Sequence, residues 1–367
     1  MSASRVFPPE LLEEIIDHLS GSTVDLLACA RVCRACVDRA QKHLFRLIAV
    51  GDESDDEDAA WVCAGRLGNA LYGNPRLVAY VRELHLRRCS DHIVRPLARI
   101  AWTRLLVLSL GKGVISSPEV LFPLVSLSCL RDLCIYAGLM RPSQLRILLG
   151  KCSLDISRIQ LNTLLFTDAP LYNSPLSPKR DAAVRRNSDD PSKITHLDFE
   201  QSRGALGEFL LHLKSIPELL DVRHIRGRDD RWSWLPFILH QAGDAVQSLD
   251  IDGGDPSLEH LNFSLLPKLS HLTVCGVGRP LASVLQQSGE NPIQMVSYLL
   301  GGGGQPDLHD LEEMILSARM PLLQKVEVRV VLKDFCVRGA GYEECVSFIE
   351  AQMPRVFERG LLTVVLD

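Results

Sequence analysis

The sequence predicts an α/β fold in which three short N-terminal helices precede an array of repeated strand-and-helix units. Two observations predict it. Apolar residues recur at helical spacing over the first 50 residues, and an LxxLxL-like motif then returns about every 25 residues along the chain. With 367 residues, the chain is too long for one core of ordinary size, so we expect two domains or an extended array.

The N-terminal segment carries the pattern of three short helices. Pro8 and Pro9 stand where the first helix should begin, a position at which proline is tolerated. Ser22 or Thr23 is placed to cap the second helix. Three helices of this size bury little surface by themselves. We therefore expect apolar side chains that a partner or a neighbouring domain must cover.

The strings FPPELLEEIIDHL and LLACARVCRACVDRAQKHLFRLI together resemble an F-box, in the form common in large fungal (basidiomycete-type) families. Cys36 departs from the resemblance, because the family often has Trp at that position. The resemblance implies docking to the Skp-type adaptor of a cullin-RING ubiquitin ligase. The residues implied to bind the adaptor are Phe7, Pro8, Pro9, Glu10, Leu11, Ile15, Leu19, Leu26, Val32, Cys33, Arg34, Leu44 and Phe45. The alternative is a helical bundle that only caps the repeat array.

The repeat predicts a parallel sheet whose strands alternate with helices. Seven of its ten intervals are 23–27 residues long, within the range of about 20–29 residues that is typical of leucine-rich repeats. Each unit cannot bury its own apolar face, so stacking of neighbouring units supplies the core. Copies of the motif begin at Val81, Leu105, Leu130, Ile156, Ile194, Leu219, Val246, Leu269, Ile293, Leu323 and Leu361.

The copies are irregular, because glycines such as Gly113 stand where regular leucine-rich repeats have Asn or Cys. The predicted organisation is an F-box at residues 5–50, an acidic linker at 51–60 and a leucine-rich-repeat-like solenoid, or horseshoe, at 61–367. An insertion at 166–192 holds four prolines and has no apolar period, so we expect it to be disordered.

A row of side chains offers a candidate surface for a protein target. The residue between the last two apolar positions of each motif faces away from the core, so these residues lie side by side across neighbouring strands. The middle of the row is acidic, which predicts docking of a basic or polar protein segment. The candidate target-binding residues are His85, Asp198, Glu200, Asp250 and Asp252.

Composition and motifs argue against several other functions. A net charge of −5 does not suit general nucleic-acid binding, and no apolar run is long enough to cross a membrane. The start of the chain lacks the pattern of a signal peptide. The 11 cysteines lack framework spacing and are interpreted as reduced thiols of an intracellular, cytoplasmic or nuclear protein.

Catalytic and metal motifs are incomplete. Asp250, Asp252 and Asp255 crowd one turn, but no nucleophile or second base accompanies them. The glycines at 111–113 and 301–304 lack the Lys-Ser/Thr of a phosphate-binding loop. Two candidate metal-ligand sets match no zinc spacing; they are Cys29, Cys33 and Cys36, and His85, Cys89 and His92. We expect no cofactor, metal or small-molecule substrate.

The F-box resemblance, together with the repeat array, implies a non-catalytic subunit that recruits a protein target to a ubiquitin ligase. The alternative is a repeat-based protein-binding scaffold with no role in a ligase. The sequence does not identify the target.

Overall fold

The structure is a computed structural model of the chain. The residues that it describes are 8–51, 57–114, 116–136, 138–140, 142–153, 155–162, 165–166, 195–200, 221–228, 239, 242–252, 258, 261–276, 279–287, 290–300, 308–318, 320–330 and 342–366. They form two compact units, the first of Met1–Ile156 with Leu165–Leu171 and the second of Ser157–Leu164 with Tyr172–Asp367. Each unit combines parallel strands with helices, which confirms the predicted α/β class.

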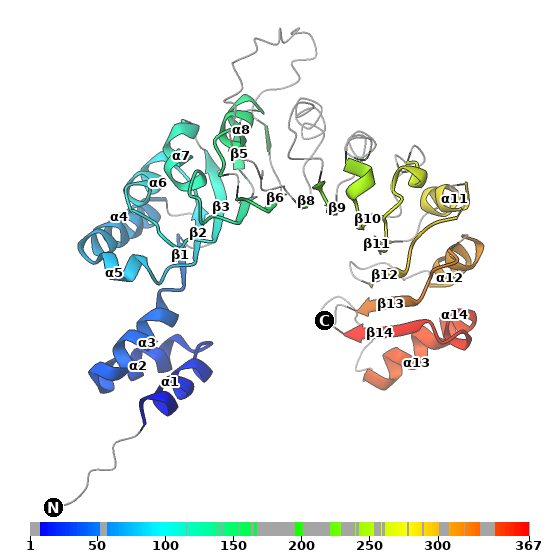
Figure 1. Ribbon diagram of the computed structural model, residues 1–367, viewed down its shortest axis with the longest axis horizontal. Coiled ribbons are helices and arrows are strands. Elements are labelled where there is room, and N and C mark those ends of the chain that lie inside the picture. Colours follow the sequence, from blue (N-terminus) through cyan, green and yellow to red (C-terminus); the bar gives the residue numbers. More distant parts are fainter. Residues whose placement is uncertain are drawn as a thin grey trace, which may run out of the picture. The chain divides into compact units, whose positions relative to one another are not determined.

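The first unit begins with three helices, α1 (Pro9–His18), α2 (Thr23–Val32) and α3 (Arg34–Leu44) (Figure 1). Proline occupies the first position of α1, and the Ser22 hydroxyl accepts a hydrogen bond from the Asp25 N–H at 3.3 Å, as the predicted cap requires. The buried side chains at the centre of the three helices are Ile16, Leu26, Cys36 and Ala40.

The segments predicted as the F-box and the linker also contain a strand and the start of a further helix. Residues 47–50, expected to end the F-box, form strand β1 (Leu47–Val50), which pairs in parallel with β2 (Glu83–Arg88). Ile48 pairs with Leu84 of β2 and is buried. The helix α4 (Glu57–Gly73) begins inside the predicted acidic linker, so residues 57–60 are helical. A short helix, α5 (Pro75–Val78), leads into β2.

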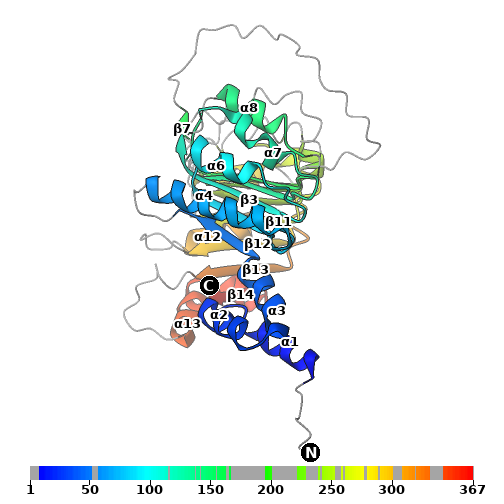
Figure 2. The same ribbon diagram turned by 90° about the vertical axis from the view of Figure 1, so that its left-hand side faces the viewer.

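The first unit continues with strands and helices in alternation. Their bounds are α6 (Asp91–Ala98), β3 (Val107–Val114), the 3₁₀ helix Pro118–Leu121, α7 (Phe122–Val125), β4 (Asp132–Tyr136), β5 (Gly138–Met140), α8 (Pro142–Leu149) and β7 (Leu165–Phe166). β2, β3 and β4 pair in parallel, and β5 lies between β3 and β7. Figures 1 and 2 show α4, α6 and α7 on one face of β2 and β3. Leu84, Leu108 and Leu133 are buried neighbours across these strands.

The second unit contains a longer parallel ladder. The described strands are β6 (Arg158–Asn162), β8 (His196–Glu200), β9 (His224–Arg228), β10 (Ser248–Asp252), β11 (His271–Cys275), β12 (Met295–Leu300), β13 (Lys325–Val330) and β14 (Leu362–Leu366). Each pairs in parallel with the next. The described helices are α11 (Arg279–Gln287), α12 (Leu308–Ser317), α13 (Tyr342–Gln352) and α14 (Pro354–Glu358). Figure 1 shows α11, α12 and α14 on one side of the strands.

Nine of the eleven predicted motif copies have the register that the structure shows, and two are misplaced. Strand β9 pairs Ile225 with Leu249, so its copy begins at Val222 and not at Leu219. Leu362 pairs with Val326, so the last copy begins two residues before Leu361. The predicted insertion lies outside the described residues except for Phe166, which ends β7. None of the described helices has the length and apolar character to cross a membrane.

Candidate docking surfaces

Helices α1 and α2 expose apolar side chains that their own core does not use. Leu11 and Ile15, one turn apart on α1, are 46% and 48% exposed, and Val32 at the end of α2 is 77% exposed. Val24 and Leu27 add two more exposed apolar residues on α2. We call these five residues the exposed apolar set. Exposed apolar side chains that form a contiguous patch are typical of protein-interaction sites.

The other predicted adaptor-binding residues divide into surface and core. Pro8, Glu10, Cys33 and Arg34 are exposed. Leu26 is only 2% exposed and belongs to the core of the three helices, so it packs the helices together and is not part of their surface. The residues Leu19 and Leu44 pack against that core, and Phe45 is half-buried just after α3. Pro9 is the first residue of α1, and Phe7 lies outside the described residues.

An ion-pair cluster fixes α1 against α3. Arg39 of α3 donates from Nε to Asp17 Oδ1 at 2.6 Å and from Nη2 to Asp17 Oδ2. His43, one turn further along α3, brings its Nε2 to 2.7 Å from Asp17 Oδ1. Hydrogen bonds from Arg39 and then His43 hold the pKa of Asp17 well below its usual range. The cluster joins residues 22 and 26 positions apart, so no local pattern in the sequence indicates it.

The candidate target-binding face of the second unit alternates in charge. Asp198, Arg226 and Asp250 are direct neighbours in register on β8, β9 and β10. Arg226 lies 3.9 Å from Asp198 Oδ2 through Nη1 and 3.2 Å from Asp250 Oδ2 through Nε. Arg158 of β6 lies 3.6 Å from Asp198. The row expected to be acidic therefore carries an arginine between its two aspartates, which the misplaced copy at Leu219 concealed.

The remaining predicted target-binding residues have different surroundings. Asp252 is exposed at the end of β10, and Glu200 ends β8. His85 lies on β2 in the first unit, with Nε2 3.6 Å from Glu83 Oε2. Glu327 of β13 continues the row of the second unit. Burial opposes its ionisation, but hydrogen bonds from Lys325 and Arg329, each 2.5 Å long, lower its pKa.

Histidines also gather on this face. His196 and His224 are neighbours in register, and their rings stack with centroids 4.1 Å apart and planes inclined by 14°. Partial burial, followed by the nearby His196, His271 and Arg223, lowers the pKa of His224. This shift favours the neutral form of the His224 ring. Alternate residues of a strand share one face, so the stacked pair lies on the same face as Asp198 and Arg226.

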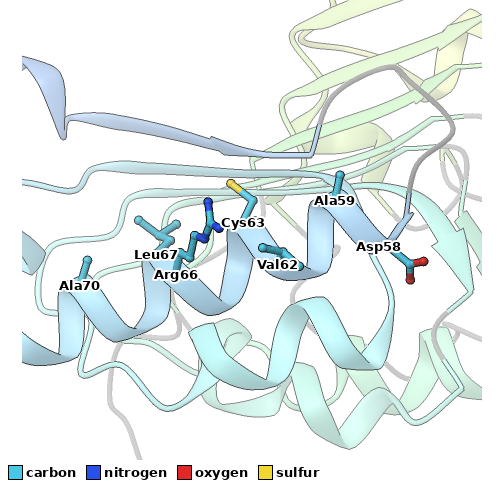
Figure 3. Close-up of a pocket in the computed structure, with 7 residues that line it drawn as sticks. All are labelled: Asp58, Ala59, Val62, Cys63, Arg66, Leu67 and Ala70. Carbon is cyan, nitrogen blue, oxygen red and sulfur yellow. The ribbon is translucent and has the colours of Figure 1, made fainter.

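A shallow hollow lies along α4 of the first unit, and seven residues line it: Asp58, Ala59, Val62, Cys63, Arg66, Leu67 and Ala70. Figure 3 shows Ala59, Cys63, Leu67 and Ala70 along one side of the helix. Because every lining residue belongs to α4, the hollow is an open helix face and not an enclosed cavity. In the part of the chain that the structure describes, no three His, Cys, Asp or Glu side chains are arranged to hold a metal ion.

No protein-family model and no curated protein sequence matches this chain. The function proposed below depends on the residues and contacts described above.

Proposed function

We propose that this chain is a substrate-recognition subunit of a cullin-RING ubiquitin ligase. Helices α1–α3 act as an F-box that docks the Skp-type adaptor. The parallel strands and their helices act as a leucine-rich-repeat-like solenoid that recruits a protein target. The chain contributes no catalytic residue to this intracellular complex, because the ligase chemistry belongs to other subunits.

The observation that carries the proposal is the exposed apolar set of α1 and α2. Leu11 and Ile15 are about half exposed although the three helices already have a core of their own, built on Ile16 and Leu26. Each fully buried aliphatic side chain contributes about 1.5–3 kcal/mol. Covering these five residues with a partner would remove apolar surface from water, which favours association. The F-box resemblance of the same segment identifies the partner as the Skp-type adaptor.

Co-purification of the full-length chain with the Skp-type adaptor tests this proposal. We expect a stable complex with the wild-type chain and at least about a tenfold loss of affinity for Leu11→Ala with Ile15→Ala. Ile147→Ala with Leu265→Ala is a matched control, because these two side chains are exposed to a similar degree on other elements. The control should bind the adaptor as the wild type does. A second variant, Val32→Ala, should also weaken binding.

A repeat-based scaffold without a ligase role is the second candidate. The exposed apolar set fits this scaffold function if a protein other than the adaptor covers it. Under this candidate the wild-type chain does not bind the adaptor, and the Leu11→Ala with Ile15→Ala variant retains its partners. The adaptor experiment therefore separates the two functions in a single comparison.

The proposed target surface is the face of the second unit that carries Asp198, Arg226 and Asp250. Because charge alternates along this row, a polar segment with complementary alternating charges fits it better than a uniformly basic one. Asp252 extends the row into solvent at the end of β10. Charge complementarity here would govern the choice of partner and the rate of association more than the total affinity.

Comparison of captured proteins between variants tests the target surface. We expect reversal of Asp198, Glu200, Asp250 and Asp252 to lysine to abolish capture of proteins that the wild-type chain retains. Because Asp198 and Asp250 pair with Arg226, the single variant Asp252→Lys tests the face with the pairs intact. The exposed acids Glu343 and Glu358 of α13 and α14, reversed to lysine, provide the control. Unchanged capture by the quadruple variant would exclude this face.

A further inference from the structure

Two cysteine side chains meet where α2 passes into α3. The Sγ atoms of Cys33 and Cys36 lie 3.3 Å apart. Cys33 is exposed and is the residue that precedes the first turn of α3, whereas Cys36 is buried among the core residues of the three helices. A disulfide S–S bond is about 2.05 Å long, so the sulfur atoms need to approach by only about 1.2 Å to become bonded.

The surroundings divide the two thiols into an attacking group and a resolving group. Hydrogen bonds from the Cys36 thiol, and then from the backbone N–H groups of Cys36 and Ala35, lower the pKa of Cys33. The contact with Cys33, and then burial, raises the pKa of Cys36 to about 11. A thiolate at a helix N-terminus beside a buried thiol is the arrangement in which the first sulfur is oxidised and the second displaces the product.

We propose that Cys33 and Cys36 form a reversible thiol–disulfide site that hydroperoxides oxidise. The Cys33 thiolate attacks one oxygen of the peroxide and breaks the O–O bond. The other oxygen leaves and takes up a proton, as water when the oxidant is hydrogen peroxide. Cys33 is then a sulfenic acid. The Cys36 sulfur attacks the Cys33 sulfur, the S–O bond breaks, and the oxygen leaves as water with the Cys36 proton. The two thiols lose two electrons in total, and the peroxide gains them.

The site requires only its two sulfur atoms and an oxidant, so it is tested on the chain without the adaptor, because Cys33 is also one of the residues predicted to bind the adaptor. The two cysteines are separated by Arg34 and Ala35. Together with Cys29 they match no zinc spacing, but as a pair they bring two sulfur atoms together. Cys63 of α4 provides an internal comparison, since it is an exposed thiol of the same unit within a helix.

Peptide mapping of the full-length wild-type protein tests the proposal. The reduced protein is treated with hydrogen peroxide, free thiols are blocked, and trypsin then cuts after Arg31, Arg34 and Arg39. We expect residues 32–34 and 35–39 to appear as one linked pair that dithiothreitol separates. Recovery of both cysteines as blocked thiols, or linkage of Cys36 to Cys29, would overturn the proposal.

Two further measurements identify the attacking sulfur. In the native reduced protein at about pH 7, iodoacetamide should modify Cys33 roughly fivefold or more faster than Cys63. In Cys36→Ala, peroxide should leave Cys33 as a sulfenic acid that dimedone traps, and Cys63→Ala should still form the linked pair. Equal alkylation rates for Cys33 and Cys63 would contradict the assigned roles. The wild-type mapping decides the proposal even if Cys36→Ala fails to fold.

Discussion

At the scale of single residues, two glycines allow β2 and β3 to lie unusually close. A Cβ atom on Gly111 would lie 2.3 Å from the Arg87 carbonyl oxygen, and one on Gly113 would lie 2.1 Å from that of Cys89. Gly113 also has a φ of 158°, which a side chain disfavours. These glycines therefore allow the close approach of the two chain segments.

Gly113→Ala should destabilise the protein strongly. The added methyl group would collide with the backbone of Cys89, whose N–H donates a hydrogen bond to the Lys112 carbonyl, so neither side can move at small cost. We expect the unfolding free energy to fall by about 3 kcal/mol, measured by urea denaturation. Gly65→Ala is the control, because its Cβ would meet no atom within 4 Å. That change in α4 should leave stability unchanged or raise it by up to about 1 kcal/mol. Equal effects of the two variants would refute the steric explanation.

Asp17 predicts an acid-sensitive step in the packing of α1 on α3. Because its pKa is lowered in the folded state, the carboxylate stabilises the fold above its ordinary pKa of about 3.9. This contribution declines as the pH falls below that ordinary value and is gone once the pH lies below the lowered folded-state pKa. Asp17→Asn should unfold at lower urea than the wild type at about pH 7 and lose less stability between about pH 5 and 3.

The control for Asp17 is Glu14→Gln, since Glu14 is exposed on the same helix. That variant should follow the wild-type pH dependence in the same urea titrations. An unchanged acid dependence for Asp17→Asn would mean that the pairs with Arg39 and His43 do not contribute to folding.

At the scale of elements, the sequence located most strands because their core positions alternate with polar ones. Leu84, Leu108 and Leu249 each stand at the expected place in a strand. β9 was misplaced because the pair Leu219–Leu220 offers an apolar start, while Gly227 replaces the last apolar residue of the true copy. A shift of three residues moves a side chain to the opposite face. Arg226 was therefore lost from the predicted target surface.

The exposed apolar set was partly predictable for a different reason. Leu11, Ile15 and Leu19 form one helical stripe in the sequence. Their spacing alone does not predict which of them pack against the other helices and which stay exposed. The structure divides it, with Ile15 exposed and Leu19 packed on the core. Contacts between residues far apart in the chain, such as Arg39 with Asp17, leave no periodic signal at all.

One long-range contact fixes the last helix of the chain. Glu312 of α12 is 1% exposed, and its Oε1 accepts hydrogen bonds from the N–H groups of Arg355 at 2.7 Å and Val356 at 2.9 Å. These N–H groups belong to the first turn of α14, where a helix lacks internal acceptors. A carboxylate at this position also suits the helix dipole.

Glu312→Ala should therefore destabilise the second unit. Two backbone donors would lose their acceptor in a buried place, which corresponds to about 2–3 kcal/mol, and hydrogen exchange of α14 should accelerate. Glu313→Gln is the control, since it disturbs only the exposed pair with Arg355, in which the atoms lie 2.7 Å apart. Exposed pairs of this kind contribute about 0–1 kcal/mol. If the two variants had equal effects, capping by Glu312 would not explain the stability of α14.

At the scale of the whole molecule, the parallel ladder makes each strand depend mainly on its neighbours. Stability in such arrays approximates a sum of local units and their nearest-neighbour contacts. The helices α1–α3 belong to the first unit, whereas the charged row on β8–β10 belongs to the second. A mutation in the charged row should therefore destabilise only β8–β10 and the strands beside them, and leave the proposed adaptor-docking helices α1–α3 unchanged.

Arg226→Glu tests this separation. The change places three acids side by side across β8, β9 and β10, and it removes a cation from beside Asp198, whose side chain is only 6% exposed. Removal of one partner from a buried pair destabilises strongly, so we expect the opening free energy of these strands to fall by about 2–4 kcal/mol. Hydrogen exchange measured by mass spectrometry should accelerate in β8–β10 and stay at the wild-type rate in α1–α3. Lys268→Glu, a charge reversal of equal size at an exposed residue before β11, should leave both regions unchanged. Faster exchange in α1–α3 of the Arg226→Glu protein would mean that the two units open as one cooperative block. Adaptor docking and target recruitment could not then be altered independently by mutation.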